Sequence, residues 1–326
     1  MRGVAVRTEL LRLAYQEVDN HPGTHHLYLK LENQQPIGAF KIRGAYNKIA
    51  SLPREERERG VITYSSGNHG QGVAYAARAL GIKAIIVMPS NAPLIKRQAT
   101  EAMGATVVLV GPSSLERQQK AEELVRQKGY AMVPPYNDEK IIAGQGTIGL
   151  EILEDLPEVD TVLVPVGGGG MISGIATAMK LSKPATKVIG VEPELASDAQ
   201  ASLEKGKLVQ FSAEQVSETI ADGLRTQSVG PINFEHIRSY VDHIVTVGEE
   251  EIRQAMRLLA RNPKTVAEPS GAVAMAAFLF HQDRLPDSDV NVAILSGGNI
   301  DPQMLAQLQT DTLTTASRQN FRPVGI

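Results

Sequence analysis

Short runs of apolar and β-branched residues alternate with helical stretches along most of this chain, and this alternation constrains its fold more than any other feature. The runs that we expect to form strands are residues 27–31, 61–65, 84–88, 106–110, 161–166, 187–192, 243–247 and 291–296. The helical stretches between them include residues 71–81, 114–129, 171–181 and 249–261. Strands that alternate with helices are typical of parallel sheets covered by helices on both faces. The sequence therefore predicts an α/β fold.

The length of the chain, 326 residues, favours about two domains over one. Residues 52–60 and 133–140 are candidate linkers, because each combines proline with charged or turn-forming residues. They predict a small mobile domain at residues 53–139, inserted in a large domain that comprises residues 1–52 and 140–312. The polar, aperiodic residues 313–326 are expected to form a flexible tail.

Composition excludes several classes of function. Lysine plus arginine number 33 and aspartate plus glutamate 36, and the absence of a basic tract argues against nucleic acid as a partner. With no cysteine, the chain has no disulfide, zinc-thiolate site or thiol nucleophile, which fits the reducing environment of the cytoplasm. The longest apolar run, residues 272–280, is too short to span a bilayer, and the first residues do not read as a secretory signal. We therefore expect a cytoplasmic protein that does not enter membranes.

Residues 65–69 form the first of three loops that follow expected strands. Ligands of open α/β sheets bind beyond the carboxyl ends of the strands, where such loops lie. The sequence Ser-Ser-Gly-Asn-His precedes a helix here, and hydroxyls and glycine amides at a helix N-terminus suit a carboxylate. The same residue types are also ordinary helix caps, so the loop alone leaves both interpretations open.

Four consecutive glycines, Gly167 to Gly170, form the second loop, between an apolar strand and a helix. So much backbone freedom favours a ligand that approaches the main chain closely, such as a phosphate bound by backbone N–H groups. The spacing fits neither a Walker loop nor a dinucleotide fingerprint, and a purely structural turn is the alternative. The third loop, residues 296–299, repeats the pattern more weakly with Ser296.

Lys41 lies in the stretch GAFKIRGAY, residues 38–46, which is otherwise largely apolar and bounded by glycine. A lysine is ordinarily part of a solvated helix face. Together with a phosphate loop, a carboxylate-binding loop and a hydroxyl at a third strand end, however, it describes a site for pyridoxal phosphate. That cofactor needs a Schiff-base lysine, an anchor for its phosphate and a partner for its ring nitrogen.

Ordered motifs over nearly the whole chain carry a family resemblance. They are GAFKIRGAYNKI, SSGNHGQGVAYAA, IAGQGTIGLEI, VGGGGMISGIA, VEPELASD and LSGGNID. In this order they closely resemble the serine/threonine dehydratase and serine racemase family of fold-type II pyridoxal-phosphate enzymes. The resemblance implies two open, twisted, mostly parallel sheets flanked by helices, with the small domain inserted in the large one, and a homodimer.

The resemblance also assigns roles to residues. Lys41 would form the Schiff base and remove the α-proton, and Ser66 would exchange a proton on the opposite face. The implied cofactor contacts are Phe40, Lys41, Asn68, Asn137, Gly167, Gly168, Gly169, Gly170, Met171 and Ser296. The implied substrate-binding residues are Ser65, Ser66, Gly67, Asn68 and His69. Glu192, Asp198 and the Ala196 carbonyl match a site for Mg²⁺, Ca²⁺ or Mn²⁺, although two acids in a loop are otherwise usually solvated.

The activity that the resemblance implies is dehydration and deamination of L-threonine or L-serine to a 2-oxo acid and ammonia. A neutral serine at position 296 favours elimination over transamination, because it does not keep the pyridine nitrogen protonated. Serine racemisation and 3-hydroxyaspartate deamination are alternatives on the same site. A non-catalytic protein that binds phosphate or a nucleotide is the alternative from another class.

The chain departs from the family pattern near Lys41. Ile37 and Ala39 replace two residues that carry hydroxyls in the family. Pro36 and Ile37 stand where nucleotide-activated racemases carry lysine and threonine, so activation by ATP is not expected. The residues after position 310 are too few for the regulatory domain of biosynthetic threonine dehydratases, and we expect no feedback by isoleucine.

Overall fold

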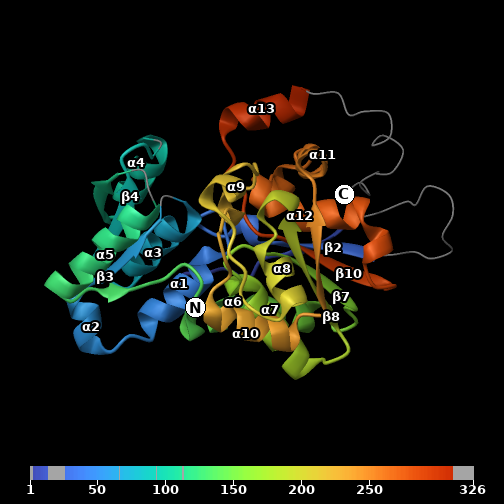
Figure 1. Cartoon of the computed structure of the whole chain (residues 1–326), viewed down its shortest axis with the longest axis horizontal. Coiled ribbons are helices and arrows are strands. Elements are labelled where there is room, and N and C mark those ends of the chain that lie inside the picture. Colours follow the sequence, from blue (N-terminus) through green and yellow to red (C-terminus); the bar gives the residue numbers. More distant parts are fainter. Residues whose placement is uncertain (1–2, 14–25, 66, 93, 112–113, 311–326) are drawn as a thin grey trace.

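The computed structural model describes residues 3–13, 26–65, 67–92, 94–111 and 114–310, and contains two sheets (Figure 1). The six-stranded sheet has the order β1-β2-β10-β7-β8-β9, and the four-stranded sheet has the order β5-β4-β3-β6. The strands of the larger sheet are β1 (Leu10–Leu13), β2 (His26–Leu31), β7 (Thr161–Pro165), β8 (Lys187–Pro193), β9 (His243–Val247) and β10 (Val290–Leu295). Those of the smaller sheet are β3 (Val61–Tyr64), β4 (Ala84–Pro89), β5 (Thr106–Val110) and β6 (Ala131–Met132).

Helices connect nearly all of these strands. The α-helices are α1 (Lys41–Ala50), α2 (Arg54–Arg59), α3 (Asn68–Ala79), α4 (Leu94–Ala102), α5 (Ser114–Lys128), α6 (Glu139–Asp155), α7 (Gly170–Ser182), α8 (Asp198–Lys205), α9 (Ala213–Ser217), α10 (Pro231–Tyr240), α11 (Glu249–Leu259), α12 (Pro269–Phe280) and α13 (Pro302–Thr310). The 3-10 helices are η1 (Glu32–Gln34), η2 (Glu194–Ala196), η3 (Asp222–Leu224), η4 (Pro263–Thr265) and η5 (Gln282–Arg284). None of these described helices is both long enough and apolar enough to cross a membrane.

The larger sheet is parallel apart from its edge strand β1, which pairs antiparallel with β2. Alternate residues of β7 enter two different cores. Leu163 packs in the core that includes α11 and α12, whereas Val162 and Val164 pack with α6 and α7. Both faces are therefore covered, which is why the strands are almost continuously apolar. The carboxyl ends of its parallel strands lie along one edge, where the candidate loops emerge.

The smaller sheet is entirely parallel. Ile86 of β4 packs with residues of α1 and α3, and its neighbours Ile85 and Val87 pack with α5. In Figure 1 this sheet and helices α3, α4 and α5 lie to the left of the larger sheet. All four of its strands fall between β2 and β7 in the chain. Whether residues 53–139 form a mobile domain stays a prediction, and the tail at residues 313–326 lies outside the described residues.

Every predicted strand and helix is present, with small shifts at the ends. Residues 54–59 of the first candidate linker form helix α2, which the sequence did not predict. Pro53 precedes this helix, acidic residues occupy its first turn and arginines its last, an arrangement that favours the helix dipole. Because α2 buries no residue, it carries no apolar stripe by which the sequence could reveal it. The short strands β1 and β6 were also missed.

Candidate active site

Lys41 is the first residue of α1 and is partly buried. Its Nζ donates a hydrogen bond to the Pro135 carbonyl at 3.0 Å and lies 5.1 Å from the centre of the Phe40 ring. Burial lowers the pKa of Lys41 to about 8, while the negative charge of Glu268 acts in the opposite direction. A lysine in such surroundings is neutral far more often than one in water. Only the neutral amine can act as a nucleophile or as a base.

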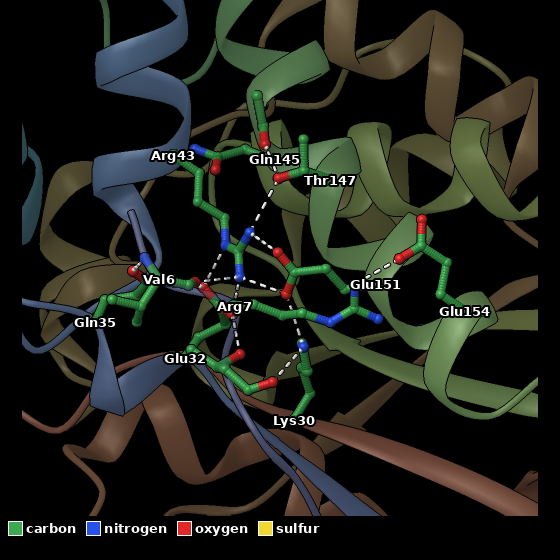
Figure 2. Close-up of polar contacts among 12 residues, drawn as sticks. Val6, Arg7, Lys30, Glu32, Gln35, Arg43, Gln145, Thr147, Glu151 and Glu154 are labelled. Carbon is green, nitrogen blue, oxygen red and sulfur yellow. Dashed lines mark hydrogen bonds and ion pairs between the residues drawn. The ribbon is translucent and has the colours of Figure 1, made fainter. Parts of the chain in front are cut away.

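Arg43 lies in the same turn of α1 as Lys41 and forms ion pairs with Glu32 and Glu151. Two helical positions correspond to a rotation of about 200°, so Arg43 points away from Lys41. Its guanidinium pairs with Glu32 at 2.7 Å and with Glu151 at 2.6 Å, and Lys30 meets Glu151 at 2.8 Å (Figure 2). Burial raises the pKa of Glu151, but hydrogen bonds and charges from Arg43 and Lys30 outweigh it and lower this pKa overall. This cluster fastens α1 to β2 and α6.

Small residues let neighbouring helices approach α1 closely. A Cβ atom on Gly72 of α3 would lie 3.2 Å from the carbonyl carbon of Lys41. One on Gly144 of α6 would lie 2.6 Å from the Cα of Gly44. Beside it, Gln145 accepts a hydrogen bond from the Gly44 amide at 3.2 Å. The glycines of the IAGQG motif therefore help to seat the helix that carries Lys41.

The glycine loop joins β7 to α7 at the carboxyl edge of the larger sheet. Gly169 has a φ angle of 90°, in the left-handed region that favours glycine, and α7 begins at the next residue. The first N–H groups of α7, which include that of the buried Met171, have no partner inside the helix. Such N–H groups and the helix dipole are suited to bind a phosphate.

Tyr136 packs against the glycine loop. Its ring occupies the space that a Cβ atom on Gly168 would need. The preceding residue, Pro135, provides the carbonyl that binds Lys41. The lysine and the glycine loop thus both contact one short segment, residues 135–136, although nothing in the sequence had singled out this tyrosine.

The loop before α3 is described except for Ser66, which lies outside the described residues. The Oγ of Ser65 accepts a hydrogen bond from the Gly67 amide at 3.3 Å, and Asn68 is the first residue of α3. The N–H groups of this first turn are free of helical partners, as the predicted carboxylate site requires.

His69 is buried, and its Nε2 bonds to the Val133 carbonyl at 2.9 Å. Burial, with a further contribution from the positive charge of Lys41, lowers the pKa of His69 to about 3. Since a carbonyl oxygen only accepts, the neutral ring carries its proton on Nε2. Any contribution of His69 to carboxylate binding would therefore come from its backbone N–H rather than from a charged ring.

Ser296 is buried directly after β10, beside the residue that precedes Lys41. Its carbonyl accepts a hydrogen bond from the Phe40 amide at 3.1 Å, and Ala39 forms an isolated antiparallel bridge with Gly297. Its Oγ lies 3.4 Å from the Ser270 carbonyl. Two motifs distant in the sequence thus run side by side.

The predicted cofactor residue Asn137 makes a different contact. Its side-chain oxygen accepts a hydrogen bond at 3.0 Å from the Ile232 amide, in the first turn of α10. It directly follows Tyr136, so it lies close to the glycine loop, but its oxygen is already engaged.

Glu192 and Asp198 are fully buried at the end of β8 and the start of α8, with the buried Ala196 between them. The Glu192 carboxylate accepts from the amides of Ala199 and Gln200 at 2.9 and 2.8 Å. Neither Asp198 oxygen meets a well-placed donor among the described residues. Burial raises the pKa of Asp198 to about 7, and burial together with the charge of Asp198 raises the pKa of Glu192.

The sequence did not reveal Glu268, which is buried near Lys41 and accepts a hydrogen bond from Asn68 at 2.6 Å. The only available signal was an acidic residue immediately before Pro269, where α12 begins. That pattern is typical of a helix cap, so it gave no reason to place Glu268 in a ligand site.

Comparison with known proteins decides what kind of site this is. The family model described as "Pyridoxal-phosphate dependent enzyme" matches residues 3–297. The chain belongs to this family. Its members bind pyridoxal phosphate, so the predicted cofactor is confirmed.

Curated members of the family are similar over most of their length. The chain is 47% identical to the L-threonine ammonia-lyase of Thermotoga maritima over 322 residues, which cover 98% of this chain and 78% of that protein. It is 44% identical to the L-threonine dehydratase catabolic TdcB of Escherichia coli over 283 residues, covering 86% and 85% of the two chains.

Solved structures of the family have the same fold. Threonine deaminase isoform 2 from Solanum lycopersicum has a TM-score of 0.86 and 40% identity, with 94% of this chain and 88% of that chain covered. Maize serine racemase has a TM-score of 0.85 and 36% identity, with 93% and 91% covered. The predicted fold class and the predicted family are both confirmed.

Proposed function

We propose that this chain eliminates the β-hydroxyl of L-threonine or L-serine as water and yields the corresponding 2-oxo acid and ammonia. The observation that carries the proposal is Lys41, a partly buried lysine with a lowered pKa, in a member of the pyridoxal-phosphate family. Its amine bonds to Pro135, whose neighbour Tyr136 packs against the glycine loop. Relatives named L-threonine ammonia-lyase and L-threonine dehydratase support it.

Bound pyridoxal phosphate supplies an electron-withdrawing ring that makes the α-proton of an attached amino acid acidic. Lys41 would hold the cofactor and, once the substrate amine has displaced it, take that α-proton with its neutral amine. The glycine loop and the first N–H groups of α7 would bind the phosphate. Phe40 would pack beside the ring, and the first turn of α3 would bind the substrate carboxylate.

Ser296 decides between elimination and transamination in this proposal. A buried carboxylate at this position would keep the pyridine nitrogen protonated, whereas a serine hydroxyl is neutral and cannot. A ring whose nitrogen is not protonated would withdraw electrons less strongly, which favours loss of the β-hydroxyl over transamination. The proposed preference is therefore elimination.

The direct test is product formation by the purified chain with pyridoxal phosphate. We expect 2-oxobutyrate from L-threonine and pyruvate from L-serine, each with one equivalent of ammonia. D-Serine and the diastereomers of 3-hydroxyaspartate, assayed beside them, rank the alternative substrates. A protein that binds the cofactor and turns over none of these would be the non-catalytic alternative.

The buried acid pair of Glu192 and Asp198 supports a divalent cation as a second bound group. Two carboxylates buried this close together repel each other unless a proton or a cation lies between them. The oxygens of Asp198, which lack a well-placed donor within the described part of the chain, and the neighbouring Ala196 carbonyl are the hard ligands that Mg²⁺, Ca²⁺ or Mn²⁺ prefer. The described residues contain no larger group of His, Cys, Asp and Glu that could compete for the ion.

Magnesium is expected to raise the unfolding temperature of the chelated protein, because an ion that binds only the native state stabilises it. At a concentration 100 times its Kd the gain is about 2.7 kcal/mol. Asp198→Asn should remove this gain. The control is Glu194→Gln, which neutralises an exposed carboxylate of η2. An equal magnesium effect in both variants would rule out the Glu192/Asp198 site.

Serine racemisation is the second candidate, since serine racemases are among the solved structures with the same fold. Racemisation needs a second acid or base on the face opposite Lys41, and the family resemblance assigns that role to Ser66. Elimination from an L-amino acid needs only the lysine face to lose its α-proton.

If both activities are present, Ser66→Ala is expected to suppress interconversion of L- and D-serine by about 100- to 10,000-fold. Deamination of L-threonine should fall much less. Chiral analysis of residual serine, beside assays of pyruvate and 2-oxobutyrate, measures both. Equal losses would mean that Ser66 mainly positions the shared carboxylate.

Three further proposals rest on resemblance and composition. They are a homodimeric assembly, movement of residues 53–139 as a small domain, and action in the cytoplasm. Sedimentation velocity tests the first of these directly.

A further inference from the structure

The side chain of Asn68 is held from two directions at the start of α3. Its Nδ2 donates to Oε1 of Glu268 at 2.6 Å. Its Oδ1 accepts from Nδ2 of Asn299 at 2.7 Å, and the same Nδ2 of Asn299 also donates to the Ile37 carbonyl at 2.9 Å. Asn68 is thus the centre of a chain of hydrogen bonds that joins α12, α3 and the segment before α1.

Both ends of this chain dictate the same orientation of the Asn68 amide. An ionised carboxylate only accepts hydrogen bonds, so Glu268 must face the nitrogen of Asn68. The Ile37 carbonyl also only accepts, which fixes the nitrogen of Asn299 and lets it donate to the oxygen of Asn68. An amide nitrogen has two hydrogens, and one of those on Asn68 remains for a further acceptor.

Two glycines, Gly38 and Gly297, make room for these partners. A Cβ atom on Gly297 would overlap Oε1 of Glu268, and one on Gly38 would overlap Oδ1 of Asn299. Gly38 also has a φ angle of 72°, which other residues rarely adopt. Gly38 and Gly297 are therefore accounted for by the side chains that hold Asn68.

Glu268 is 6% exposed and occupies the N-cap position of α12, yet its side chain does not cap that helix. Its carboxylate turns to Asn68 instead, and its backbone N–H donates to the Gly297 carbonyl at 3.1 Å. A buried carboxylate costs free energy unless its charge is compensated. Its negative charge also acts on Lys41, which places it within electrostatic range of the lysine.

We propose that Glu268 and Asn299 are positioning residues that hold the Asn68 amide with a free N–H toward the ring hydroxyl of the cofactor. The inference rests on the proposed function, in which Asn68 binds that hydroxyl. Without Glu268 the amide could turn and present its oxygen, which cannot donate a hydrogen bond to the ring oxygen.

The test compares binding of pyridoxal phosphate with binding of its 3-deoxy analogue, which lacks the ring hydroxyl. The wild-type chain is expected to prefer the natural cofactor by about 10- to 100-fold, the value of a hydrogen bond to a charged oxygen. Glu268→Leu and, as a milder change, Glu268→Gln should each reduce this preference toward unity. Glu251→Gln, at the N-terminus of α11, should leave the preference for the natural cofactor unchanged. Glu251 accepts a hydrogen bond from the Gly248 amide and takes no part in holding Asn68.

A polarity swap separates orientation from simple cross-linking. In the double variant Asn68→Asp with Glu268→Gln, the glutamine can donate to the new carboxylate, so α3 and α12 remain joined. No donor then faces the cofactor from position 68, and the preference should stay lost in a chain that thermal unfolding shows to be folded. A preference restored by the swap, or unchanged in both single variants of Glu268, would overturn the inference. The affinity ratio needs no turnover, so it remains measurable even if the proposed activity fails.

Discussion

Lys41→Ala is expected to abolish deamination of L-threonine and L-serine, with a loss of more than about 10,000-fold. In the proposed mechanism, this substitution removes both the amine that would hold the cofactor and the base that would take the α-proton. The visible absorbance of the lysine-bound cofactor should disappear with it, and borohydride should no longer fix pyridoxal phosphate to the chain. Stopped assays for 2-oxo acids and absorbance spectra of the reconstituted protein measure these effects.

The variant should nevertheless fold, and without cofactor it is expected to be more stable than the wild type. Folding lowers the pKa of Lys41 from 10.5 to about 8, so below pH 8 the folded state carries the whole cost of a buried ammonium. That cost is on the order of 3 kcal/mol and should disappear as the pH rises from 8 to 10.5. Lys48→Ala, farther along α1, is the control and should keep its activity. Near-normal turnover by Lys41→Ala would exclude the proposed mechanism.

Gly168→Ala is expected to weaken binding of pyridoxal phosphate by about 10- to 100-fold for each backbone contact that the phosphate loses. The new methyl group would overlap the Tyr136 ring, so either the tyrosine or the loop must move. Titration of the cofactor-free protein, followed by absorbance, gives the affinity. Maximal turnover at saturating cofactor should fall less than affinity does.

Gly206→Ala is the matched control for the glycine loop. Gly206 has a φ angle of 65° and open space where a Cβ atom would lie. Its substitution strains the backbone, which costs about 1 kcal/mol or more of stability, but it leaves the loop intact. Equal losses of cofactor affinity in both variants would show that reduced stability, rather than the shape of the loop, explains the effect.

The sequence predicted the strands and the three loops because the physical signals for these features are local. Apolar, β-branched runs such as residues 84–88 indicate a strand buried on both faces of a sheet. The four glycines Gly167 to Gly170 indicate a place where another group approaches the backbone closely. The resemblance added roles for Lys41 and Ser296, which the structure brings together through the Phe40 amide.

Side-chain orientation could not be predicted in the same way. Glu268 looks like a helix cap in the sequence, and only the fold shows that its carboxylate faces Asn68 instead. Tyr136 is one aromatic residue among turn formers, and its position over Gly168 depends on how β7 and α6 pack. Such relations depend on residues far apart in the chain, for which no short motif exists.

The cluster around Arg43 also sets an order of assembly. Arg43 bonds to Glu32, 11 positions earlier, and to Glu151, 108 positions later. A growing chain that has not yet reached α6 therefore contains Arg43 and Lys30. Of the two carboxylates it contains only that of Glu32, because Glu151 lies in α6. Contacts between such distant positions close large loops and form slowly. The lysine-bearing helix can thus reach its final seat only after the whole smaller sheet has been synthesised.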